Sequence, residues 1–163
     1  MSPAAPPPAV VTPASPVARI LAGESATAAL ADWCAIHGLP TVEARLAPGT
    51  GKAPGRPVRA ILGGHEPLRF RHVTLVCGAR TVSTADNWYA PGQLTAEMNH
   101  RLETTDAPFG RVVKPLGFTR RTLATRSLGG GRVEVTAVLT TAAGTPFSYV
   151  VERYAAAVLS RVR

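Results

Sequence analysis

Apolar residues recur at helical spacing in two parts of the chain, and both parts are predicted to be helices. In residues 25–37 the large apolar side chains share one face, which places Trp33 in the expected core. In residues 94–104 an apolar residue occupies every fourth position from Leu94 to Leu102. Each segment has a serine or threonine at its start that can cap a helix. We therefore expect two helices that each turn one apolar face toward a partner layer.

Shorter runs with strand-like patterning predict a β-sheet. The alternation of apolar and polar residues is plainest from Val133 to Leu139, between two glycine-containing turns. Such short connections join neighbouring strands in antiparallel fashion. The expected strands are residues 42–46, 58–62, 68–76, 81–91, 119–126, 133–139 and 147–158. The pattern predicts an α+β fold, with a single antiparallel β-sheet of about six strands covered by two or three helices.

The length of 163 residues fits one domain with a substantial core, and 45% of the residues are hydrophobic. Residues 1–16 form a leader rich in proline and alanine that is expected to have no fold of its own, so the domain is predicted to span residues 17–163. Six prolines in this leader prevent the continuous apolar helix of a signal peptide. No run is long enough to span a bilayer, so we expect a cytoplasmic protein without a membrane span.

The residues that most often bind metals or cofactors show no recognisable spacing in this chain. Cys34 and Cys77 are too few for a disulfide framework, lack the spacing of a zinc site, and are predicted to be small buried thiols. The four histidines are also not spaced as ligands, and Walker, dinucleotide-binding and nucleophile-elbow motifs are missing. We therefore predict no metal and no cofactor.

The net charge of +8 comes mostly from arginines that are scattered along the chain. Nucleic-acid-binding proteins usually gather their basic residues in a run or on one helix face, so we expect no nucleic-acid partner. The guanidinium group binds carboxylates and phosphates through two parallel hydrogen bonds. Scattered arginines therefore fit a site for a small anion at least as well as a polyanion surface. Arg111, Arg121 and Arg126 are further anion-binding candidates, and the alternative for each is a solvated side chain. The oligomeric state is not predicted.

Four short motifs share their order with a known enzyme family. They are Arg71-His72-Val73-Thr74-Leu75, Asn87-Trp88-Tyr89-Ala90-Pro91, Ala107-Pro108-Phe109-Gly110 and Tyr149-Val150-Val151-Glu152. In these motifs the chain resembles the chorismate pyruvate-lyase (4-hydroxybenzoate synthetase) family. The resemblance implies a chorismate lyase-like fold and a cofactor-independent elimination of pyruvate from chorismate, which leaves 4-hydroxybenzoate for ubiquinone biosynthesis.

Glu152 is the candidate catalytic residue. It lies in the middle of an apolar strand, where a carboxylate is costly unless it is paired or functional. The resemblance implies that it contacts the ring hydroxyl of the substrate. The alternative is an edge-strand surface glutamate that pairs with Arg153 or with an arginine across the strand. If Glu152 lies in a pocket, a change to glutamine should reduce binding without a loss of stability.

The other candidate site residues would bind an aromatic carboxylate. The family's ring-carboxylate arginine corresponds to Arg71 or to His72, and these two side chains point to opposite faces of the strand. Arg71 is preferred because its fork of donors suits a carboxylate. Asn87 stands where the family often has a second arginine, and Phe109 and Gly110 match a turn that covers the ligand.

Two functions therefore stay open. Asn87 can donate a hydrogen bond but brings no charge, so affinity for a dianion such as chorismate should fall. The main prediction is a chorismate lyase-like enzyme, and whether catalysis is retained is left undecided. The alternative is a non-catalytic protein with the same fold that binds or senses a small aromatic acid.

Overall fold

The computed structural model describes residues 15–47 and 51–159. Most of the predicted proline-rich leader, residues 1–14, lies outside the described residues. The described part begins with Ser15, whose hydroxyl oxygen accepts a hydrogen bond from the Ala18 amide and caps the first helix. Pro16 is the first residue of that helix, so the final two residues of the predicted leader belong to the fold.

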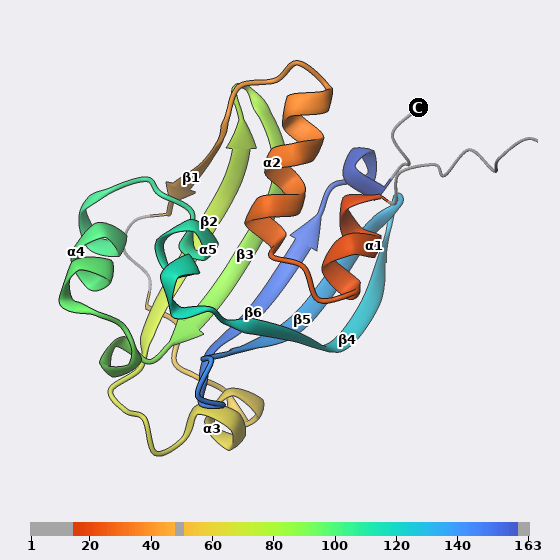
Figure 1. Cartoon of the computed structure of the whole chain (residues 1–163). Coiled ribbons are helices and arrows are strands. Elements are labelled where there is room, and N and C mark those ends of the chain that lie inside the picture. Colours follow the sequence, from red (N-terminus) through yellow and green to blue (C-terminus); the bar gives the residue numbers. More distant parts are fainter. Residues whose placement is uncertain (1–14, 48–50, 160–163) are drawn as a thin grey trace, which may run out of the picture.

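Six antiparallel strands form one sheet with the order β1-β2-β3-β6-β5-β4 (Figure 1). The strands are β1 (Val42–Leu46), β2 (Arg69–Cys77), β3 (Arg80–Tyr89), β4 (Thr119–Gly129), β5 (Arg132–Thr140) and β6 (Pro146–Tyr154). The α+β fold with a single antiparallel sheet is confirmed. Short turns join β2 to β3, β4 to β5 and β5 to β6, whereas the connection from β1 to β2 contains α3. β6 lies beside β3 and so completes the sheet.

The described residues contain five α-helices, two more than the upper limit of the prediction. They are α1 (Pro16–Leu21), α2 (Ala26–Ile36), α3 (Arg56–Leu62), α4 (Ala96–Thr104) and α5 (Phe109–Val112), with 3₁₀ turns at Pro91–Gln93, Lys114–Leu116 and Ala156–Leu159. The side chains of Ser25 and Thr95 cap α2 and α4, so both predicted helices are confirmed. Within the described ranges, no helix has the length and apolarity needed to cross a membrane.

One predicted strand was wrong. Residues 58–62 belong to the helix α3, in which Pro57 occupies the first turn and sets a helical backbone angle. Val58 and Leu62 are four residues apart, so they share one helix face, and both are buried. A short apolar run of this kind fits a strand and a buried helix equally well when only its periodicity is considered.

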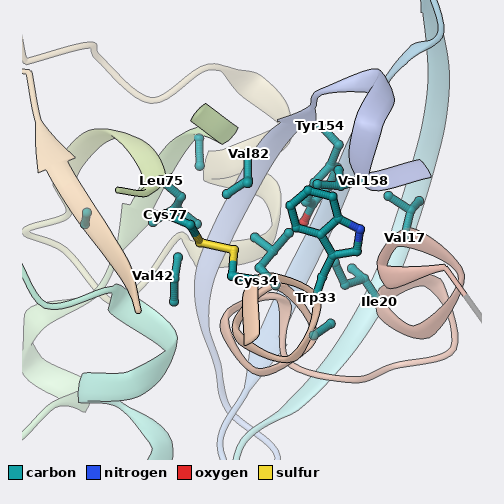
Figure 2. Packing of buried hydrophobic residues seen from close by; sticks show 14 of the residues in the cluster. Val17, Ile20, Trp33, Cys34, Val42, Leu75, Cys77, Val82, Tyr154 and Val158 are labelled. Carbon is teal, nitrogen blue, oxygen red and sulfur yellow. A yellow bond between two sulfur atoms is a disulfide. The ribbon is translucent and has the colours of Figure 1, made fainter. Parts of the chain in front are cut away.

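The helices cover the two faces of the sheet unequally. Three apolar clusters fill the space between helices and strands: one brings α1 and α2 to the sheet, a second brings α4 and α5, and the third brings α3. Trp88 packs with α3, whereas its neighbour Tyr89 packs with α4 and α5, so α3 lies on the opposite face. In Figure 2, Trp33 of α2 lies among Ile20, Tyr154 and Val158, as expected for a core residue.

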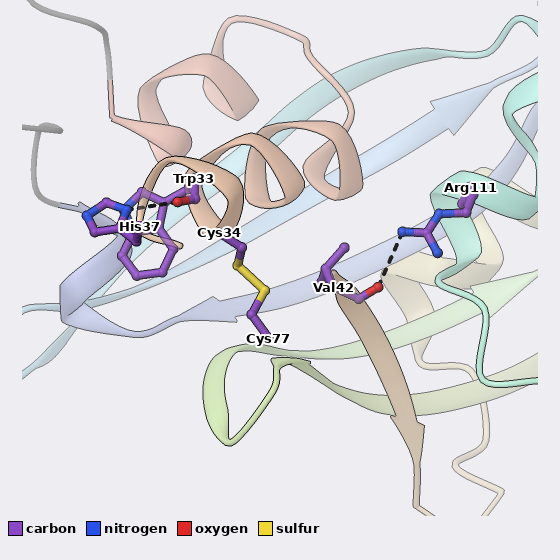
Figure 3. The surroundings of a disulfide bond; sticks show 6 residues. All are labelled: Trp33, Cys34, His37, Val42, Cys77 and Arg111. Carbon is purple, nitrogen blue, oxygen red and sulfur yellow. Dashed lines mark hydrogen bonds between the residues drawn. A yellow bond between two sulfur atoms is a disulfide. The ribbon is translucent and has the colours of Figure 1, made fainter. Parts of the chain in front are cut away.

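The prediction that Cys34 and Cys77 are free thiols was wrong, because the two residues form a disulfide. Cys34 lies on the side of α2 that faces the sheet, and Cys77 is the last residue of β2 (Figure 3). Their Cα atoms are 6.3 Å apart, within the usual range for a disulfide. The bond therefore ties a helix to a strand across 43 residues of sequence.

Candidate functional site

A small cavity of about 60 Å³ lies on the face of the sheet that α2 and α5 cover. On this measure, one water molecule needs roughly 10–15 Å³, so the cavity has room for a compact ligand. Five of the six predicted site residues line it, namely Arg71, Asn87, Phe109, Gly110 and Glu152. Strand pairing brings three of them together, since Arg71 lies opposite Asn87 and the partner of Glu152 on β3 is two residues from Asn87.

Arg71 is a buried cation without a carboxylate partner in the described part of the chain. Its side chain lines the cavity, and the residue is only 6% exposed. Nη2 donates a hydrogen bond to the Ala107 carbonyl oxygen at 3.0 Å, whereas Nε and Nη1 are buried and have no partner among the described atoms. Burial lowers the pKa of this guanidinium below its ordinary value, and the charge of Asp106 offsets only part of this effect. Nε and Nη1 of Arg71 are therefore available to donate hydrogen bonds to an anion.

Asn87 offers a further unused donor beside Arg71. Its Oδ1 accepts a hydrogen bond from the Ser148 hydroxyl at 2.7 Å, which orients the amide. Nδ2 is buried and has no hydrogen-bond partner among the described residues. Because buried polar groups are nearly always satisfied in folded proteins, three unused donors on Arg71 and Asn87 indicate a missing acceptor.

Glu152 also lines the cavity, but its carboxylate is already engaged. Arg120 of β4 donates to both carboxylate oxygens, with Nη1 3.1 Å from Oε2 and Nη2 on Oε1. Both residues are buried. Burial by itself lowers the pKa of Arg120, but the charge and hydrogen bonds of Glu152 outweigh this effect and raise it above its ordinary value. Glu152 thus has an arginine partner, but not the one that the alternative prediction described, because β6 is an interior strand, β5 lies between it and the strand of Arg120, and the pair is buried.

Arg120 is the charged residue that sequence reasoning missed. The sequence shows Arg120 and Arg121 side by side on a strand, so one of them had to lie on the face that α2 and α5 cover. The choice between them depends on the register of β4, which its turns do not reveal. None of Arg111, Arg121 and Arg126, the arginines singled out from the sequence, lines the cavity.

His72 lies on the opposite face of β2 and does not line the cavity. Its Nδ1 is 2.6 Å from Oδ1 of Asp86, and the second carboxylate oxygen of Asp86 is 3.5 Å from Nη1 of Arg153. The alternation of side chains along β2 therefore leaves Arg71 as the cavity residue, as preferred from the sequence.

The first turn of α2 forms another wall of the cavity, which the sequence did not indicate. Ser25, Ala26 and Thr27 line it together with Phe109 and Gly110 of α5. The first amides of a helix have no partner within the helix, and its dipole is positive at this end. Ser25 satisfies one of these amides, because its Oγ accepts a hydrogen bond from the Ala28 amide at 3.4 Å. The start of α2 therefore favours negative charge at this wall.

Gly110 is required where α5 meets the first turn of α2. A Cβ atom at this position would lie 2.7 Å from Oγ1 of Thr27 and 3.2 Å from Oγ of Ser25. We expect Gly110→Ala to lower the free energy of unfolding by about 1–3 kcal/mol, as measured by urea denaturation. Thr27→Ala in the same chain should recover part of the loss. Gly92→Ala is the control, since nothing lies within 4 Å of its added Cβ, and an equal loss there would contradict the steric explanation.

The donor set of the cavity suits an anion better than a metal ion. Its charged side chains are two arginines and one glutamate, and no other carboxylate, histidine or cysteine lines it. Elsewhere in residues 15–47 and 51–159, no group of three or more histidine, cysteine, aspartate and glutamate side chains is arranged to hold a metal. The unpaired donors of Arg71 and Asn87 suit a ligand that carries several hydrogen-bond acceptors.

Several solved structures share this fold at low sequence identity. PhnF from Mycobacterium smegmatis matches with a TM-score of 0.59 and 13% identity, over 84% of this chain and 66% of PhnF. The effector domain of PhnF matches with a TM-score of 0.55 and 13% identity, over 80% of this chain and 87% of that domain. The possible transcriptional regulator YydK from Bacillus subtilis matches with a TM-score of 0.52 and 13% identity, over 75% of this chain and 62% of YydK.

The chain thus spans less than two thirds of the length of YydK and of PhnF. The likeness confirms the chorismate lyase-like fold and does not extend to the activity of that enzyme family.

Sequence comparison shows a nearer relationship. No family model matches the chain. The uncharacterized protein y4mC of Sinorhizobium fredii (strain NBRC 101917 / NGR234) is 40% identical over 167 aligned residues, which cover 84% of this chain and 70% of y4mC. At this identity and coverage, the chain belongs to the same family as y4mC.

Proposed function

We propose that this domain binds a small monocarboxylate in the cavity at Arg71 and acts as a ligand-binding or sensing domain. The observation that carries the proposal is Arg71 itself, a buried cation with two donors that have no partner among the described residues. A carboxylate can accept from both donors at once, and such charge-assisted pairs are the strongest hydrogen bonds in proteins. Nδ2 of Asn87, on the neighbouring strand, is a third donor for the same group.

The charge of the site supports a ligand with one negative charge. Glu152 neutralises Arg120, which leaves Arg71 as the uncompensated charge among the side chains that line the cavity. A second carboxylate on the ligand would have to be buried without a cation of its own, which costs several kcal/mol. The walls next to these polar groups carry Phe109 and Phe118, so an aromatic acid such as 4-hydroxybenzoate is the proposed class.

The same charges speak against chorismate as a substrate. Chorismate is a dianion, and the position at which the family often has a second arginine is Asn87 in this chain. The Glu152 carboxylate, which the resemblance implied as the contact for the ring hydroxyl, is instead held by the two Nη groups of Arg120. The fold shared with a structure described as the effector domain of PhnF also supports a binding or sensing role.

Arg71→Met is the variant that tests the proposal. By calorimetry, the affinity for 4-hydroxybenzoate should fall about 10- to 100-fold, because hydrogen bonds to charged groups are worth roughly 1.5–3 kcal/mol. The unfolding free energy should change little, since the lost bond to Ala107 is offset by removal of an uncompensated buried charge.

His72→Ala is the matched control, because His72 neighbours Arg71 on β2 but lies on the other face. Its affinity for 4-hydroxybenzoate should equal that of the unmodified chain. Equal affinity in the Arg71→Met variant would remove Arg71 from the site. Chorismate is added in parallel, with released pyruvate coupled to lactate dehydrogenase, and turnover above background would restore the lyase alternative.

A further inference from the structure

We propose that the Cys34–Cys77 disulfide is a redox-controlled clamp that sets the position of α2 and thereby the shape of the cavity. The bond joins α2 to β2, and these two elements also form two walls of the cavity. Ser25, Ala26 and Thr27 come from the first turn of α2, and Arg71, Val73 and Leu75 come from β2. Reduction of the disulfide therefore affects the two cavity walls that α2 and β2 form.

The disulfide is the one covalent connection between α2 and the sheet in the described part of the chain, and the guanidinium of Arg80 on β3, 5.8 Å from the Trp33 ring centroid, adds a cation–π contact. The hydrogen bonds of α2 are internal, or reach α1 and the turn that follows α2, and none of them reaches a strand. Apolar packing of Ala29, Leu30 and Trp33 accounts for the rest of the contact. Such packing has no directional preference, whereas a disulfide fixes the separation of the two residues.

The clamp and the cavity lie at opposite ends of α2. Cys34 is in the last turn of the helix and Thr27 is in the first, about 10 Å away at the rise of an α-helix. α2 also supports α5, because Thr27 contacts Gly110 closely. A shift of the helix would therefore reach the Phe109–Gly110 wall as well as Ser25 to Thr27.

Both cysteines are buried, but the end of α2 next to Cys34 is exposed. Cys34 is 1% and Cys77 is 0% exposed, whereas Ile36, two residues after Cys34, is 58% exposed. Opening of this last turn gives a reductant access, since helix ends open more readily than the rest of a helix. Reduction adds two electrons and two protons to give two thiols, and a dithiol reductant supplies both while it becomes a disulfide. In a cytoplasmic location, as the sequence predicts, the bond would form only on oxidation.

Backbone amide chemical shifts of the full chain, oxidised and in dithiothreitol, test the clamp without a ligand. Reduction should shift the resonances of residues 25–28 and 109–111, at the far end of α2, as well as those next to the cysteines. Residues 128–131, in the β4–β5 turn, are the internal control and should not shift. Changes confined to the neighbours of Cys34 and Cys77 would overturn the proposal. Cys34→Ala/Cys77→Ala should match the reduced chain and no longer respond to dithiothreitol.

The ligand experiment rests on the proposed function. In calorimetry, 4-hydroxybenzoate should bind the reduced chain about tenfold more weakly, a factor within the usual range of coupling between sites. Equal affinity in both states would overturn the clamp while the proposed function stands. If 4-hydroxybenzoate binds neither state, the proposed function fails, and the chemical shifts of residues 25–28 still decide whether reduction moves α2.

Discussion

Glu152→Gln is expected to lower the free energy of unfolding by about 3–5 kcal/mol, because the change leaves Arg120 as a buried charge without its counterion. This result would differ from the expectation drawn from the sequence, in which a neutral residue at position 152 left stability unchanged. The difference arises from Arg120, which is buried and donates to both carboxylate oxygens. Urea denaturation of the variant and the unmodified chain gives the comparison.

Two further variants give this measurement its controls. Arg120→Met/Glu152→Leu removes both charges, and its stability should return to within about 1 kcal/mol of the unmodified chain or exceed it. Glu24→Gln breaks the exposed ion pair with Arg19 and should cost at most about 1 kcal/mol. A loss at Glu152 no larger than at Glu24 would show that water screens the Arg120–Glu152 pair.

The sheet could be predicted because its strands carry their own signals. Val133 to Leu139 alternates and is flanked by turns, so neither its structure nor its antiparallel pairing needed tertiary information. The helix over residues 56–62 could not be predicted in the same way, since five apolar or small residues contain too few turns to show a period. Its identity depends on Trp88 and Tyr149, which come later in the chain and supply the surface on which it packs.

The candidate site could be predicted only in part, and the division has a physical cause. Arg71 and Glu152 stand out because a charge within an apolar strand is costly wherever that strand is buried. Arg120 does not lie in an apolar strand, since β4 carries polar residues at most positions near it, so nothing in the sequence marks this arginine as buried. The wall formed by the start of α2 was not predicted either, because a helix cap has the same sequence whether it faces solvent or a cavity.

The disulfide could not be predicted, because pairing of two cysteines depends on how α2 lies on β2. Spacing along the chain gives no sign of this, since 43 residues separate Cys34 from Cys77. Two cysteines are also compatible with buried thiols.

Cys34→Ala/Cys77→Ala is expected to lower the free energy of unfolding by about 4 kcal/mol, the loss that chain entropy predicts when a closed loop of this length is opened. The folded state keeps most of its packing, because Leu30 and Trp33 still hold α2 on the sheet. The unmodified chain in dithiothreitol should unfold at nearly the same urea concentration as the Cys34→Ala/Cys77→Ala variant. Thr104→Ala/Thr105→Ala, a double change at exposed positions, serves as the control. If loss of the bond costs less than about 1 kcal/mol, the unfolded chain must already hold α2 near β2 without it.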